Sequence, residues 1–488
     1  MFVSKKYYSG LLIFFFAGIM VSHAQERPVS ITSSITEKPA GKAMEEGKFE
    51  KSGEMKQGNG MRESSYSPII EEPFDKVMAR DKAEKAGVMK RHMDLLGGRY
   101  DLSKKVANDV TMSGGKPLPV GPTARLKNGL TWETLSSMTP EEIKEQNVFP
   151  YLPLPHPNHA SGGMLFSQLQ VKQFPRLERI DLDFDLPEHF LPEFPPPMYL
   201  TTHKKMGDVS QGKVITLDNY YEVFNGILNP KQLEGLRLLV TQFPQQQFNA
   251  TADRKSEKPS QGVTCFDCHV NGHTSAATHL VGDIRPQSHR NRIDTPSLRG
   301  VNIQRLFGSQ RALKSIEDFT EFEQRAAYFD GDILTATKKG ANILERGSQV
   351  HFMAEFQALL DFPPAPKLDL YGRLDPKKAT DSEIRGQTIF FSKGKCFECH
   401  PAPYYTDNLM HDLQVERFYK SKVINGQYIR AEGPIKTFPL RGIKDSPPYL
   451  HDGRLLTLED TVEFFNLVLQ TSLNEEEKKD LVAFLRQL

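Results

Sequence analysis

Two stretches of the chain, Cys265-Phe-Asp-Cys-His269 and Cys396-Phe-Glu-Cys-His400, share one pattern and contain all four cysteines of the protein. Two thiols at this spacing can add to the two vinyl groups of one haem, while the adjacent histidine turns under the ring to ligate the iron. The pattern therefore predicts two covalently bound haem c groups, with iron ligated by His269 and His400. The predicted attachment residues are Cys265, Cys268, His269, Cys396, Cys399 and His400.

Cysteine pairs at this spacing also occur in zinc sites and in redox dithiols. A zinc site gathers its ligands in one cluster, whereas these two pairs lie in widely separated parts of the chain. A redox dithiol does not need a histidine at the fifth position, yet both stretches have one. The sequence therefore favours haem attachment over either alternative.

The N-terminus indicates export. Two lysines precede an apolar run from Leu11 to Val21, and the small residues Ser22 and Ala24 predict cleavage before Gln25. The run is too short to span a bilayer, which needs about 20 apolar residues. We therefore expect residues 1–24 to be a signal peptide, a periplasmic location, and no transmembrane segment in the mature chain.

The length and charge of the chain limit which classes of protein it can belong to. The chain has 488 residues, 38% of them hydrophobic, and a formal net charge of +1. This length allows two or three domains, and haem would add apolar bulk to their cores. No basic stripe, P-loop or dinucleotide glycine fingerprint stands out, which argues against nucleic acid and nucleotide functions.

The first half of the chain has a mixed composition. Residues 25–70 are rich in charged and small residues, which predicts a disordered tether. Residues 71–230 predict an irregular accessory region, with a helix around 74–96 followed by proline-rich segments. We expect this region to pack on the haem-bearing part. It contains the only tryptophan of the chain, Trp132.

The haem-bearing part contains an internal repeat. Segments 234–240 and 385–391 each predict a short amphipathic helix ahead of a motif. After the motifs, Leu298-Arg-Gly-Val301 and Leu440-Arg-Gly-Ile443 are each followed by a Glu-Asp pair, and the spacing from arginine to glutamate is the same in both halves. Equal spacing of this kind indicates duplication.

The repeat predicts a mainly α fold with two tandem cytochrome-c-like helical haem domains, at residues 231–365 and 379–488. The second domain should end in a helix that covers its haem pocket. Asn474 can cap that helix, and acidic residues follow where the helix dipole favours anions.

The motifs and their surroundings resemble the bacterial di-haem cytochrome c peroxidase family, including MauG-type enzymes, over roughly residues 231–488. The resemblance rests on Asp294-Thr-Pro-Ser-Leu-Arg-Gly300 after the first motif, and on Pro448-Tyr-Leu-His-Asp-Gly-Arg454 with Thr457-Leu-Glu-Asp460 after the second. It does not cover the part of the chain before residue 231. It implies that the haem on His269 is peroxidatic and that the haem on His400 relays electrons.

The sequence departs from the family pattern at the positions expected to supply the sixth iron ligands. Pro286 occupies the position where the peroxidases have a capping histidine and where MauG-type enzymes also have proline. Because proline cannot ligate iron, the resemblance implies an open distal site at the first haem. Alternative ligands nearby are His273, His279 and His289.

At the second haem, Phe465 replaces the methionine or tyrosine of the family and offers no donor atom. This haem is then either five-coordinate or ligated by Met410, His411 or Tyr449.

Peroxide cleavage needs a group that moves a proton between the two oxygens. By resemblance that group is Glu345, with Asp330 and Asp332 as alternatives. Arg311 falls within one position of the match to Arg454 in the internal repeat, so we expect both arginines to pair with haem propionates.

The family also holds a calcium ion, and the matching positions are Asp294, Ser446 and Pro448. The tryptophan between the haems of relatives has no counterpart here, since the aligned stretch is Phe307-Gly-Ser309.

These expectations combine into an exported di-haem c-type oxidoreductase that is peroxide-dependent. Its partners would be hydrogen peroxide or another small oxidant, and a small redox protein or quinol-linked electron donor. Two alternatives stay open: a non-catalytic electron-transfer cytochrome, and a di-haem oxygenase that uses dioxygen.

Overall fold

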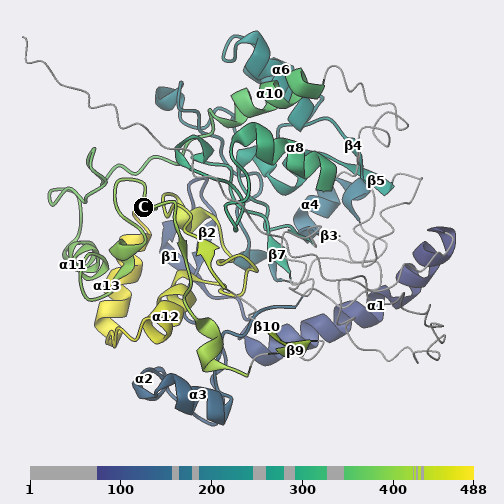
Figure 1. Cartoon of the computed structure of the whole chain (residues 1–488). Helices are drawn as coiled ribbons and strands as arrows, with labels where there is room; N and C mark the ends of the chain where they lie inside the picture. Colours follow the sequence, from purple (N-terminus) through teal and green to yellow (C-terminus); the bar gives the residue numbers. More distant parts are fainter. Residues whose placement is uncertain are drawn as a thin grey trace, which may run out of the picture. The chain divides into compact units, whose positions relative to one another are not determined.

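The computed structural model describes residues 74–155, 164–178, 186–245, 260–279, 292–326, 346–420, 422–424, 427–429 and 433–488 (Figure 1). Within these residues helices predominate and strands are short, as the predicted mainly α class requires. The predicted signal peptide and tether lie outside the described residues, and so do Pro286, His289, Asp330, Asp332 and Glu345. Among the described residues, no helix is both long and apolar enough to cross a membrane.

Each motif is associated with a pair of packed helices. Helix α6 (Pro230–Leu239) packs on α10 (Arg346–Gln357), and α11 (Asp381–Phe390) packs on α13 (Glu475–Leu485) (Figure 1). In each pair the first helix precedes a Cys-x-x-Cys-His motif. The two amphipathic helices predicted ahead of the motifs are therefore present.

A glycine lies at each of these helix contacts. A Cβ atom on Gly235 would lie 1.9 Å from the carbonyl oxygen of Phe352, and a Cβ atom on Gly386 would lie 1.9 Å from that of Asp480. Only a residue without a Cβ lets the two backbones approach this closely. The glycine shared by segments 234–240 and 385–391 thus has the same packing role in both halves.

The loops after the motifs repeat as well. Gly300 and Gly442 adopt left-handed φ values of 73° and 74°, and each begins a short 3-10 turn. Isolated bridges follow, pairing Phe307 with Leu313 and Tyr449 with Leu455. The helices α8 (Ile316–Ala326) and α12 (Leu458–Val468) then begin at equivalent positions.

The remaining elements are short, apart from the first helix. The region before the first motif contains α1 (Phe74–Arg99), β1 (Val106–Thr111), β2 (Pro117–Pro119), α2 (Trp132–Ser137), α3 (Pro140–Gln146), β3 (Met164–Leu165), α4 (Gln168–Gln173), α5 (Tyr220–Phe224), β4 (Phe243–Gln245) and β5 (Ser260–Val263). Later come α7 (Cys265–Cys268), β6 (Thr278–His279), β7 (Ile293–Asp294), β8 (Met410–His411), β9 (Lys422–Ile424), β10 (Gln427–Ile429) and β11 (Ile435–Lys436). The strands pair antiparallel as β1-β2, β3-β6-β7, β4-β5, β8-β11 and β9-β10.

Residues of the 71–230 region complete the core around the second motif. The ring of Phe149 stacks on Phe418 with centroids 5.3 Å apart, and Tyr151 packs edge-on against Phe464 at 6.0 Å. These rings belong to one apolar cluster with residues of α11, α12 and α13. A separate cluster contains apolar residues of α5, α6, α7 and α10. The accessory region therefore contributes to the packing near the second motif.

Buried polar contacts join distant segments. The carboxylate of Asp460 accepts hydrogen bonds from the backbone N–H and the hydroxyl of Thr123, both at 2.7 Å, and from the hydroxyl of Tyr151 at 2.9 Å. The carboxylate of Asp445 pairs with Arg299 at 2.9 Å, and both side chains are almost fully buried. These two aspartates connect the loops of the repeat with one another and with the accessory region.

Candidate functional site: two Cys-x-x-Cys-His motifs

The first motif is a single helical turn, α7, with His269 directly after it. Thr264 caps the turn, and Asp267 closes the capping box while its carboxylate receives a bidentate pair from Arg176 at 2.7 Å. The Nδ1 atom of His269 lies 2.9 Å from the carbonyl oxygen of Pro296. Because a carbonyl can only accept, Nδ1 carries the proton, and Nε2 is the nitrogen with the lone pair.

The second motif repeats this geometry. Cys396–Glu398 form a 3-10 turn after Lys395, which adopts a left-handed φ of 57°. The Nδ1 atom of His400 lies 2.7 Å from the carbonyl oxygen of Tyr405, so this ring also carries its proton on Nδ1. Burial lowers the pKa of His400 to about 4, and the imidazole is therefore neutral at physiological pH.

The donor set fits haem c in both motifs. The four cysteines form no disulfide. Burial raises the pKa of the Cys268 thiol well above its ordinary value, that of Cys396 to about 12 and that of Cys399 to about 11. A carbonyl bond to the second ring nitrogen is the usual way in which a protein orients a metal-binding histidine. Each motif thus offers two unoxidised thiols and one imidazole oriented by a backbone carbonyl.

Two of the alternative sixth ligands have other partners. His273 is buried, with Nδ1 2.7 Å from the Ser297 hydroxyl and Nε2 2.9 Å from the Asp445 carbonyl oxygen. Both of its ring nitrogens are engaged, so neither lone pair is directed at an iron. The Nε2 atom of His411 lies 2.7 Å from the carboxylate of Asp407. Of the other histidine alternatives, His279 lies in β6.

The candidate sixth ligands of the second haem lie in different environments. Tyr449 is buried and its backbone forms a bridge with Leu455, while Met410 lies in β8 opposite Lys436. Phe465 packs edge-on against Phe464, with centroids 5.2 Å apart. Phe464 is itself buried in the core.

The structure places Arg311 one position before the residue that matches Arg454 in the repeat, within the one position that the sequence predicts. The bridge Phe307–Leu313 matches Tyr449–Leu455, which aligns Arg311 with Gly453 rather than with Arg454. Arg311 adopts a left-handed φ of 54°, and Gly453 one of 68°. Arg454 is fully buried, with Nε 2.8 Å from the carboxylate of Asp452. The role of either arginine towards a propionate stays a prediction.

Two of the predicted calcium positions lie close together. A Cβ atom on Gly453 would lie 2.9 Å from Cγ of Pro448 and 3.8 Å from Cβ of Asp294. Ser446 follows the 3-10 turn Ile443–Asp445. No three His, Cys, Asp or Glu side chains converge on a metal within the described residues, so a cation here would depend on backbone carbonyls. Calcium stays a prediction.

Sequence reasoning did not single out Glu323, which lies in α8. Burial raises the pKa of Glu323 to about 7, and its charge contributes to the raised pKa of Cys268. A carboxyl group with this pKa beside a motif cysteine has the properties of an acid-base group. Its sequence signal was its place in the helix whose first turn contains the Glu-Asp pair.

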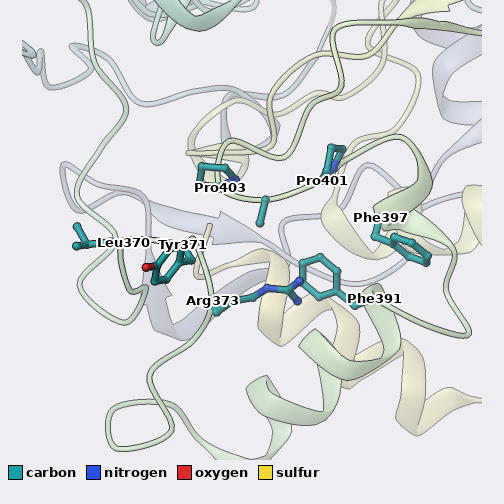
Figure 2. A pocket seen from close by; sticks show the side chains of 8 residues that line it. Leu370, Tyr371, Arg373, Phe391, Phe397, Pro401 and Pro403 are labelled. Carbon is teal, nitrogen blue, oxygen red and sulfur yellow. The ribbon is translucent and has the colours of Figure 1, made fainter. Parts of the chain in front are cut away.

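A pocket of about 380 Å³ opens beside the second motif (Figure 2). The guanidinium of Arg373 lies over the ring of Phe391, 3.4 Å from its centroid. Leu370 and Tyr371 are 95% and 78% exposed, so this rim presents apolar groups to solvent. The pocket is lined by Leu370, Tyr371, Arg373, Phe391, Phe397, Pro401, Ala402 and Pro403.

No family model matches the chain. Cytochrome-c peroxidase IdrP2 of Denitromonas iodatirespirans is 27% identical over 158 residues, covering 25% of this chain and 43% of the relative. Cytochrome c551 peroxidase of Nitrosomonas europaea is 29% identical over 143 residues, covering 28% and 42%. Methylamine utilization protein MauG of Methylorubrum extorquens is 28% identical over 150 residues, also covering 28% and 42%. The chain thus spans less than half the length of these relatives.

Two solved structures are also similar to the chain. A MauG-like protein associated with microbial copper homeostasis has a TM-score of 0.36 at 17% identity, covering 62% of this chain and 94% of the other. The diheme peroxidase BthA of Burkholderia thailandensis has a TM-score of 0.34 at 16% identity, covering 61% and 94%.

The curated relatives include both cytochrome c peroxidases and MauG proteins, which are the two groups that the sequence resembles. The predicted resemblance is therefore confirmed, over about a quarter of the chain. Over that part, the chain is a distant homologue of the di-haem cytochrome c peroxidase and MauG family.

Proposed function

We propose that this protein is an exported di-haem c-type oxidoreductase that uses hydrogen peroxide. The observation that carries the proposal is the repeated motif geometry, in which both histidines donate from Nδ1 to a backbone carbonyl. Homology to peroxidases and MauG proteins supports the reaction class. The apolar run from Leu11 to Val21 behind two lysines supports export to the periplasm.

The proposal gives each motif residue a task. Cys265, Cys268, Cys396 and Cys399 would attach two haems, which when bound supply iron for peroxide reduction and electron transfer. The carbonyl bonds to His269 and His400 would hold each imidazole in one orientation and raise its basicity towards iron. By family resemblance the His269 site reacts with peroxide and the His400 site relays electrons from a small redox protein or a quinol-linked donor.

Proton transfer needs a carboxyl group near the reacting oxygens. Glu345 holds this role by family resemblance, and Glu323 is a second candidate, because burial raises its pKa to about 7 and its charge acts on Cys268 of the first motif. Replacing the true acid-base group with glutamine should lower the peroxidase rate by roughly 10²-fold or more. The variant of the other residue should keep a rate close to that of the unaltered protein, which makes the two assignments separable.

The first test is the optical and EPR spectrum of oxidised holoprotein before and after stoichiometric hydrogen peroxide. A high-spin haem signal that changes rapidly on mixing supports an exchangeable iron site and a catalytic role. Two low-spin haems that do not respond to peroxide would contradict the peroxidase assignment and favour an electron-transfer cytochrome. Rapid reaction with dioxygen after reduction, but not with peroxide, would favour an oxygenase.

A further inference from the structure

Lys436 lies where the loops of the two repeats meet. Its strand, β11, pairs with β8, and its backbone N–H donates to the carbonyl oxygen of Ser309 at 2.9 Å. The side chain is 3% exposed, and its Nζ atom donates to Oε1 of Gln304 at 2.7 Å. A lysine from the second repeat is therefore buried against the loop that follows the first motif.

Two other buried or half-buried lysines have more oxygen partners than Lys436 has. Lys116 donates from Nζ to the carbonyl oxygens of Glu188, Leu191 and Pro192 at 2.6, 2.8 and 3.2 Å. Lys478, which is 7% exposed, pairs with Glu463 and Glu475, each at 2.5 Å.

Lys436 has a single amide oxygen as its oxygen partner. Its other neighbours are the rings of Phe307 and Phe438, whose centroids lie 5.6 and 5.1 Å from Nζ. No carboxylate among the described residues forms an ion pair with it. Removing an ammonium group from water without a counter-charge is strongly unfavourable, and ring faces offset only part of that cost.

A second cation belongs to the loop that contacts Lys436: Arg311 follows two residues after Ser309, whose carbonyl accepts from the Lys436 backbone. The charge of Arg311 acts on Lys436, and together with burial, which is the larger cause, it lowers the pKa of Lys436 to about 8. The Nε atom of Arg311 is buried and has no hydrogen-bond acceptor among the described residues.

The backbone at Arg311 also disfavours a side chain. Its φ of 54° is the left-handed conformation that glycine adopts at the equivalent Gly453. The chain thus keeps an arginine at a strained position, where its charge acts on a buried lysine of the same sign.

We propose that Lys436 and Arg311 form a carboxylate-binding site between the two repeats, and that in the holoprotein the carboxylate is a haem propionate. A guanidinium fork and a lysine point charge are the usual donors for such an anion. The identity of the carboxylate rests on the proposed function, because only a haem protein supplies a propionate. The other source of the same chemistry is a small free carboxylate, for which malonate is the probe.

The test uses full-length holoprotein carrying Lys436→Met, with Lys314→Met as the matched control. Lys314 is an exposed lysine shortly after Arg311 in the chain, so its replacement removes the same charge without touching the site. Haem content is measured first, by pyridine haemochrome absorbance and intact mass. Reduction potentials are then measured by spectroelectrochemistry, and thermal midpoints with and without malonate.

If a propionate occupies the site, Lys436→Met lowers the reduction potential of one haem and lowers the thermal midpoint, because an anion loses its partner. Lys436→Arg restores both values, and Lys314→Met changes neither. If the site holds a free carboxylate instead, both potentials stay unchanged, while malonate raises the midpoint of the unaltered protein but not that of Lys436→Met. Should Lys436→Met not fold, Arg311→Gln takes its place in every measurement.

Three results together would overturn the inference. Lys436→Met would raise the midpoint of thermal unfolding, it would leave the reduction potentials of both haems unchanged, and malonate would have no effect on the midpoint. Those results would mean an empty site from which an unpaired charge was removed. If the purified protein contains no haem, the proposed function is refuted, and so is a propionate as the bound carboxylate. The malonate measurement alone would then show whether Lys436 and Arg311 bind a carboxylate. The two failures are therefore distinguishable.

Discussion

Replacing Gly386 with alanine tests the packing that places the second motif. The added Cβ would lie 1.9 Å from the carbonyl oxygen of Asp480, on the facing helix α13. A backbone carbonyl cannot rotate away as a flexible side chain can, so the two helices must separate. Overpacking of this kind costs about 1–3 kcal/mol, and the severity of the clash places it at the upper end.

Alanine also favours the helix, by about 1 kcal/mol relative to glycine. The net expectation for Gly386→Ala is thus a loss of about 2 kcal/mol, which is roughly a 30-fold change in the unfolding equilibrium. Gly347→Ala is the control, because it lies in a helix with no atom within 4 Å of the added Cβ. It should leave stability unchanged or raise it by up to about 1 kcal/mol.

The assay is urea unfolding of the holoprotein, followed by far-ultraviolet circular dichroism and by haem absorbance. If the overpacking argument holds, Gly386→Ala shifts the midpoint to lower urea while the control does not. Gly235→Ala should behave as Gly386→Ala does, because its Cβ would meet the Phe352 carbonyl at the same 1.9 Å. Equal or greater stability of Gly386→Ala, compared with the unaltered protein, would refute the reasoning.

Two other predictions concern buried charge. Asp445→Asn leaves the buried guanidinium of Arg299 without its carboxylate, so we expect a loss of about 3–5 kcal/mol in unfolding free energy, and a loss below about 1 kcal/mol would contradict this. For Asp480, burial opposes ionisation, yet the hydrogen bonds from Arg385 and Ser382 prevail and lower the pKa of the carboxyl. Its stabilisation is therefore complete above the unfolded pKa of about 3.9 and is lost as the pH falls through the lower folded value. Asp480→Asn should show a shallower fall of the unfolding midpoint with acid, measured between about pH 2 and pH 6, and an unchanged slope would exclude Asp480 as a source of acid sensitivity.

Local patterns in the sequence predicted the elements whose causes are local. The helix around residues 74–96 is present as α1, and the closing helix begins after Asn474, whose side chain accepts from the backbone of Glu477. Capping and helical periodicity act within a few residues, so they can be read without knowing the fold. The repeat was visible for the same reason, since equal spacing needs no contacts to be recognised.

The sequence by itself also determined the chemistry of the motifs, because two cysteines and a histidine at fixed spacing constrain one another directly. Only the tertiary structure decided which partners surround them. It placed both ring nitrogens of His273 against Ser297 and Asp445, and it buried Lys436 with no carboxylate partner among the described residues. The partners of His273 and Lys436 come from parts of the chain that are distant in sequence. Hydrogen bonds and burial between such groups arise only once the fold brings them together.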